Sequence, residues 1–232
     1  MRVRILGVLA TLAALIALVV VYFVYFLESN PPAIAASPDG PGAVSLTLMT
    51  VPSYGHHPFP DWVSYMVRDP SGHWQHSTIY KLPAHTLVHV TVYQFDSQTG
   101  LRNNFLAQIR GTIGGVADYT DVGNTGKGSG LPSYDNTPVS TLPPSTPAHT
   151  FTVPDIDLSV PLVGISATAT NTCSVAPCAM SFAHTTITFS FRTPKAGTYR
   201  WQCFVPCALG FLYGFGGPMQ TIGYMDGLLE VT

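Results

Sequence analysis

Residues 193–207 read Thr-Pro-Lys-Ala-Gly-Thr-Tyr-Arg-Trp-Gln-Cys-Phe-Val-Pro-Cys. The Pro and Gly at the start of this stretch indicate a turn, and the residues after the Gly predict a strand. Cys203 and Cys207 then lie four residues apart on one loop. Two cysteines at this spacing can bind copper, close a small disulfide or carry out redox chemistry. A partner elsewhere in the chain has to decide among these, and His149, in His-Thr-Phe-Thr-Val-Pro, is a candidate.

The composition indicates a domain built from many short strands. The chain has 232 residues, of which 21 are Gly and 20 are Pro, and this abundance of turn residues disfavours a helical bundle. Only 9% of the residues are charged and the formal net charge is −2. Since no basic patch is present, we expect no nucleic acid as a partner.

Alternating apolar residues and turn signals predict an all-β domain at residues 43–232. Residues 52–80 are expected to form an elaborated loop with a short helix near 61–67. Two long insertions, at 111–147 and 167–180, interrupt the strands, and the first is of a length usually linked to function, disorder or a partner. Six or seven short strands indicate a β-sandwich, and the segments expected as strands are 43–51, 87–93, 101–110, 150–153, 185–191, 198–202 and 227–231.

The N-terminal segment predicts a single membrane anchor. Residues 5–27 form an uncharged apolar run, long enough as a helix to cross a hydrocarbon core of about 30 Å. Arg2 and Arg4 precede the run, which orients the rest of the chain to the extracytoplasmic side. We therefore expect an anchor at 1–28, a linker at 29–42 and a single-pass protein of the cell membrane. The alternative is a signal peptide cleaved near Ala33 to Ala35.

Three motifs, in order, resemble subunit II of the haem–copper oxidases, such as cytochrome c oxidase. The segment at His149 is similar to the first-histidine segment of that family, and Cys203-x-x-x-Cys207 is similar to its copper loop. Residues 225–231, Met-Asp-Gly-Leu-Leu-Glu-Val, are similar to its Met-x-Gly-x-[Ile/Leu]-x-Val ending. The clear match covers about the last third of the chain.

The resemblance implies a cupredoxin-like Greek-key β-sandwich that holds a dinuclear copper (CuA) centre and passes electrons. The metal ligands it implies are the His149 imidazole, the Cys203 and Cys207 thiolates, the Val205 backbone carbonyl and the Met225 thioether; Met219 is an alternative to Met225. The family has a further histidine four residues after the second cysteine. In this chain that position is Phe211, and alignment from Met225 instead places it at Ile222.

Other residues and readings stay open. His184, or His56 and His57, are candidates for the missing imidazole. Cys203 and Cys207 can instead form a disulfide, and the pair Cys173 and Cys178 is expected to be a structural disulfide, since disulfides persist outside the cytoplasm. Asp155 and Asp157 are turn residues or, by resemblance, groups that dock a basic carrier.

Two functions follow as hypotheses. The first is a copper-binding, electron-transfer protein with an altered site. The second is a copper-free accessory subunit of a respiratory membrane complex, with the cysteines as disulfides, and copper storage or delivery is a third possibility. No independent catalytic motif such as Gly-x-Ser-x-Gly occurs, so any enzyme role is that of an electron-transfer subunit in an oxidoreductase complex. The expected partners are the membrane and either other subunits or a redox carrier protein.

Overall fold

The computed structural model describes residues 2–22, 30–55, 61–100, 102–123, 138–206 and 217–232. The chain divides into two compact units, Met1–Pro31 and Pro32–Thr232. The first unit contains the helix α1 (Arg2–Tyr22), which is rich in Leu, Val and Ala. Among the residues that the structure describes, no helix is both long enough and apolar enough to cross a membrane.

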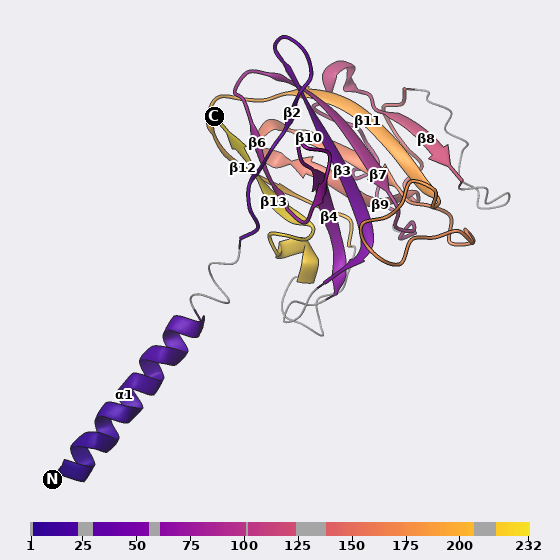
Figure 1. The fold of residues 1–232 in the computed structure, drawn as a ribbon. Coiled ribbons are helices and arrows are strands. Elements are labelled where there is room, and N and C mark those ends of the chain that lie inside the picture. Colours follow the sequence, from indigo (N-terminus) through magenta and orange to yellow (C-terminus); the bar gives the residue numbers. More distant parts are fainter. Residues whose placement is uncertain (1, 23–29, 56–60, 101, 124–137, 207–216) are drawn as a thin grey trace. The chain divides into compact units, whose positions relative to one another are not determined.

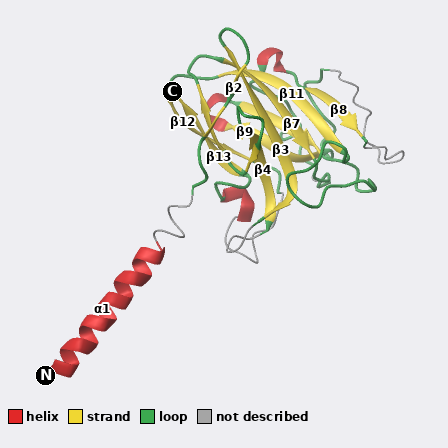
Figure 2. Ribbon diagram, in the orientation of Figure 1, coloured by secondary structure: helices red, strands yellow, loops and turns green. Residues whose placement is uncertain are grey.

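The second unit is a β-sandwich, as the sequence predicts, with two sheets that face each other across one core (Figures 1 and 2). The first sheet has six strands in the order β1-β6-β13-β12-β9-β10, and the second has the order β5-β4-β3-β7-β11-β8, with β2 paired to β3. The strands are β1 (Ile34–Ala35), β2 (Ser37–Pro38), β3 (Ala43–Tyr54), β4 (Trp62–Arg68), β5 (Trp74–Gln75), β6 (Ile79–Leu82), β7 (Leu87–Gln94), β8 (Asp118–Val122), β9 (Pro147–Val153), β10 (Leu158–Val163), β11 (His184–Arg192), β12 (Gly197–Gln202) and β13 (Asp226–Val231).

The core between the sheets is built around Trp201 of β12, which is fully buried. Tyr65, Tyr80 and Phe151 surround its indole with ring-centroid distances of 4.8, 5.6 and 5.0 Å. The indole Nε1 donates a hydrogen bond of 3.0 Å to the carbonyl oxygen of Thr78. This contact explains the glycine in the Met-Asp-Gly motif, because a Cβ at Gly227 would overlap the Thr78 carbonyl and the indole.

The helix expected near 61–67 is wrong, because this segment is the strand β4. Strand β4 pairs with β3 in antiparallel register, from Leu48 opposite Val67 to Tyr54 opposite Trp62. Five consecutive residues of β4 are buried, since one face lies on the main core and the other is also covered. A strand covered on both faces lacks the alternation that identifies strands in a sequence.

Two other boundaries differ from the expectation. Residues 34–38 of the predicted linker form β1 and β2, and these pair with β6 and β3 of the sandwich. Residues 102–110 of the segment expected as a strand hold only isolated bridges, at Gln108 and Arg110. The rest of that region runs as turns, consistent with its polar Arg-Asn-Asn start.

Both predicted insertions contribute to the sandwich. Within 111–147, the structure describes a short 3-10 helix, η2 (Ile113–Gly115), and β8, which extends the second sheet beside β11. The second insertion, 167–180, carries the disulfide between Cys173 and Cys178, as predicted. This disulfide packs with Met49, Val51, Met66 and Phe95 in a second apolar cluster, separate from the main core.

Candidate functional site

His149 lies in β9, where all seven residues are buried. The strand has neighbours on both sides, since β10 pairs along its length and β12 pairs through Gln202 opposite Thr152. The imidazole has no solvent exposure. A histidine held in this way has to satisfy both ring nitrogens inside the protein.

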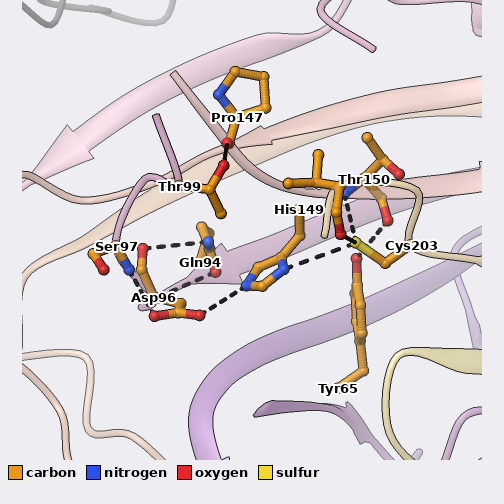
Figure 3. A network of polar contacts seen from close by, with 10 residues as sticks. Tyr65, Gln94, Asp96, Ser97, Thr99, Pro147, His149, Thr150 and Cys203 are labelled. Atoms are coloured by element: carbon orange, nitrogen blue, oxygen red, sulfur yellow. Dashed lines mark hydrogen bonds and ion pairs between the residues drawn. The ribbon is translucent and has the colours of Figure 1, made fainter. Parts of the chain in front are cut away.

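Cys203 supplies one partner of this imidazole. The residue directly follows β12 and is fully buried, and its backbone N–H donates a 2.9 Å hydrogen bond to the carbonyl of Met225. Its Sγ lies 3.8 Å from His149 Nδ1 (Figure 3). The backbone N–H of Thr150 lies 3.4 Å from the same sulfur, and Sγ is 3.3 Å from the carbonyl oxygen of Val205. His149 and Cys203 are 54 residues apart in sequence, yet their side chains meet.

Asp96 supplies the other partner and was not expected from the sequence. Its Oδ2 lies 3.0 Å from His149 Nε2, and its Oδ1 accepts a 2.8 Å hydrogen bond from the backbone N–H of Ser97. Asp96 follows β7 of the second sheet, whereas His149 belongs to the first sheet. The three side chains therefore join the two sheets in the order Asp96, His149, Cys203 (Figure 3).

The electrostatics of this row favour a charged imidazole. Burial opposes the charge, but the hydrogen bonds to Asp96 and Cys203 outweigh it and raise the pKa of His149 to about 9. Burial likewise works against ionisation of Asp96, and its interaction with His149 outweighs this and lowers the pKa of the carboxyl group. At neutral pH the row is an ion pair between Asp96 and His149, held beside the Cys203 sulfur.

The remaining residues implied as ligands lie at different distances from this row. Val205 is buried, and its carbonyl contacts the Cys203 sulfur. Met225 is fully buried and is joined to Cys203 through the backbone. Met219 is only half-buried in the 3-10 helix η4 (Gly217–Gln220), and its carbonyl accepts from Gln202 instead. The structure therefore favours Met225 over Met219 as a neighbour of Cys203.

Several predicted residues lie elsewhere or outside the described residues. The latter include Cys207, Phe211, His56 and His57, and with them the possible disulfide between Cys203 and Cys207. His184 is buried against Phe95 and Tyr93, with its Nδ1 2.8 Å from the carbonyl oxygen of Phe182.

Ile222, at the other expected histidine position, forms an isolated bridge to Asp226. Across the described ranges, no group of three or more His, Cys, Asp or Glu residues has the arrangement of a metal site.

Asp155 and Asp157 occupy a turn. Asp155 lies in the 3-10 helix η3 (Pro154–Ile156), and Asp157 ends that helix in the left-handed conformation, with φ of 50°. Oδ1 of Asp157 lies 3.4 Å from Nε of Arg110. Both residues therefore have the geometry of turn residues, which is one of the two roles expected from the sequence; the other is docking of a basic carrier.

Comparison with protein-family models, with curated proteins and with solved structures finds no match to this chain. The geometry of Asp96, His149 and Cys203, together with the sequence motifs that contain two of them, is therefore what indicates the function.

Proposed function

We propose that this chain is a membrane-anchored, extracytoplasmic copper protein with a cupredoxin-type fold and a role in electron transfer. The observation that carries the proposal is the 3.8 Å approach of His149 Nδ1 to Cys203 Sγ, with His149 Nε2 on a carboxylate. Imidazole nitrogen and thiolate sulfur are the donors that copper prefers in proteins. Histidines that bind metals usually donate their other ring N–H to a carboxylate or a carbonyl, as His149 does to Asp96.

The fold supports the same proposal. A β-sandwich is the architecture implied by the resemblance to oxidase subunit II, and the three motifs converge within it. His149 lies in β9, Cys203 directly follows β12 and Met225 directly precedes β13, and β12 adjoins both of the other strands. Motifs that are dispersed along a sequence but meet in space are better support for a site than motifs matched in sequence alone.

The donors that the structure brings together, the His149 imidazole, the Cys203 sulfur and the Val205 carbonyl, fit a copper ion in part. The ligand set we propose adds to them Cys207, which lies outside the described residues, and the Met225 thioether, both from the sequence resemblance; the Val205 carbonyl and the thioether are the weaker ligands. Bound copper would supply a one-electron couple. The chain itself excludes water, because His149 and Cys203 have no exposed surface, and it orients the imidazole through Asp96. The Thr150 N–H directed at the Cys203 sulfur is the kind of contact that tunes the potential of a copper–thiolate site.

Localisation outside the cytoplasm is supported by the disulfide between Cys173 and Cys178, since such bonds persist in oxidising compartments. The membrane anchor is proposed from the apolar run at 5–27 and the arginines that precede it. In this location the partner would be a redox carrier protein or another subunit of a respiratory complex.

Copper binding is tested with the full-length chain and two histidine variants. The protein is loaded with copper, dialysed, and assayed for bound metal and for thiolate-to-copper absorption. We expect stoichiometric copper in the wild type and in His184→Ala, which removes a second buried imidazole. His149→Ala should lose the metal. Equal copper content in the two variants would show that His149 is not a ligand.

One observation favours a second candidate, a copper-free accessory subunit. The row Asp96, His149, Cys203 satisfies both imidazole nitrogens without a metal, and its charges balance with His149 protonated. In that case the sandwich is a scaffold and its long loops contact a membrane partner. Absence of bound copper from the wild-type chain after loading would favour this candidate.

A further inference from the structure

A shallow depression of about 240 Å³ lies on the surface beside the end of β3. One side is formed by Ser53, Tyr54 and Asp61, and the other by residues 174–176, which lie inside the loop closed by the Cys173–Cys178 disulfide. The volume is below the range of roughly 300–1,000 Å³ typical of drug-sized ligands. The depression therefore suits one head group rather than a whole ligand.

The lining of this depression combines one aromatic ring, that of Tyr54, with one carboxylate, that of Asp61. Tyr54 stacks on His76 at 3.8 Å, and His76 in turn meets the edge of Tyr224, which also contacts Trp62. His76 is held by a 2.9 Å hydrogen bond between its Nε2 and Oγ of the buried Ser64. Because each ring is fixed by the next, Tyr54 is a preorganised part of the wall.

Asp61 brings a negative charge to this aromatic wall. The residue is exposed, and its Oδ1 accepts a hydrogen bond from the Ser53 hydroxyl. Among the described residues, no lysine or arginine forms an ion pair with Asp61. The charge of Asp61 also acts on the nearby Tyr224. Burial first, and then the charge of Asp61, raise the pKa of Tyr224 to about 12.

We propose that this depression binds an organic cation, either an ammonium or a guanidinium group, between the Tyr54 ring, the Asp61 carboxylate and the disulfide-closed loop. An aromatic face attracts a cation through its quadrupole, and a neighbouring carboxylate adds direct charge attraction. Residues 174–176, on the other side, carry small or apolar side chains, Ser, Val and Ala, that offer no competing charge. The site is independent of copper, because neither His149 nor Cys203 lines it.

Binding is measured by nuclear magnetic resonance titration of the full-length, metal-free chain, followed at the Trp62 indole. Tetramethylammonium represents a free cationic ligand, and a short arginine peptide represents a side chain of a protein partner. The uncharged 3,3-dimethylbutan-1-ol has a similar shape to choline and controls for apolar contact, and sodium chloride controls for ionic strength.

We expect saturable binding of a cationic probe and none of the alcohol. Asp61→Asn should weaken this binding roughly two- to fivefold, the contribution of one carboxylate in an exposed ion pair. Asp39→Asn removes the same charge from an exposed turn and should leave it unchanged. Preference for tetramethylammonium would assign the site to a free ligand, and preference for the peptide would assign it to a protein partner.

The wall made by residues 174–176 gives a second test. Cys173→Ser combined with Cys178→Ser releases the loop and should weaken cation binding without altering copper content. Binding that is not saturable, or that is equal for the alcohol and the cations, would overturn the proposal. So would an affinity that is the same in Asp61→Asn and Asp39→Asn.

Discussion

Replacing Asp96 by Asn is the most informative perturbation of the row Asp96, His149, Cys203. Asn keeps the shape of the side chain and removes the charge that faces His149 Nε2 at 3.0 Å. The pKa of His149 rises from 6.5 to about 9 in the folded chain, a shift of roughly 2.5 units. At about 1.4 kcal/mol per unit, the partners of the charged imidazole stabilise the fold by about 3 kcal/mol. Asp96 shares this with Cys203, so we expect Asp96→Asn to cost about 2 kcal/mol at pH 6.

The pH dependence gives the prediction its sign. Between pH 6.5 and 9 the folded chain retains the His149 proton, while the unfolded chain has released it. Unfolding therefore releases a proton, and the free energy of unfolding falls as the pH rises through this window. At the acid end, the lowered pKa of Asp96 means that its contribution is lost as the pH falls below 3.8, its usual value. The ion pair between Asp96 and His149 therefore stabilises the chain most between about pH 3.8 and pH 6.5, the usual pKa values of the two groups.

The assay is urea unfolding of the metal-free, full-length chain, followed by near-ultraviolet circular dichroism from pH 5 to pH 10. The difference between wild type and Asp96→Asn should shrink from about 2 kcal/mol at pH 6 to below about 1 kcal/mol at pH 10, where His149 is neutral in both. Asp39→Asn controls for the change in net charge. A difference that does not vary with pH would refute the ion pair.

Two further predictions concern the scaffold. Gly227→Ala should lower the free energy of unfolding by about 3 kcal/mol, since its Cβ would overlap the Thr78 carbonyl and the Trp201 indole; Gly7→Ala, where a Cβ meets open space, is the control, and an equal effect of the two would contradict the packing. Cys173→Ser with Cys178→Ser should cost about 2 kcal/mol, because the disulfide closes a loop with a sequence separation of only 5. Unchanged urea unfolding in that double variant would show that the Cys173–Cys178 disulfide does not stabilise the folded chain.

The β-sandwich could be predicted from the sequence where strands have one buried face. In β7, Leu87–Gln94, and β11, His184–Arg192, buried residues alternate with more exposed ones, and the two strands pair in antiparallel register. Strand β4 cannot be recognised in this way because both of its faces are covered, so its burial shows no period of two. The cover on its second face includes the disulfide-closed insertion, whose position depends on tertiary structure.

The candidate site could be predicted only in part, because one of its residues is positioned by tertiary structure alone. His149 and Cys203 were identified because they lie in motifs with local patterns. Asp96 lies in no such motif: it follows β7 in the second sheet and reaches His149 only because the two sheets pack together. An acidic residue just after a confident strand is a weak signal, and many such residues simply form turns, as Asp157 does.

The two candidate functions make different use of a single atom. In the copper protein, His149 Nδ1 binds the metal, and in the scaffold it holds a proton directed at the Cys203 sulfur 3.8 Å away. Asp96 favours both states, because a carboxylate on Nε2 makes the imidazole a better metal ligand and also raises its affinity for a proton. The surroundings therefore favour a positive charge at this position in either case. Copper has to displace a proton bound with a pKa of about 9, so the presence of copper depends on thiolate donors that the scaffold would not need. This identifies Cys203, and the state of its sulfur, as the feature that separates the two functions.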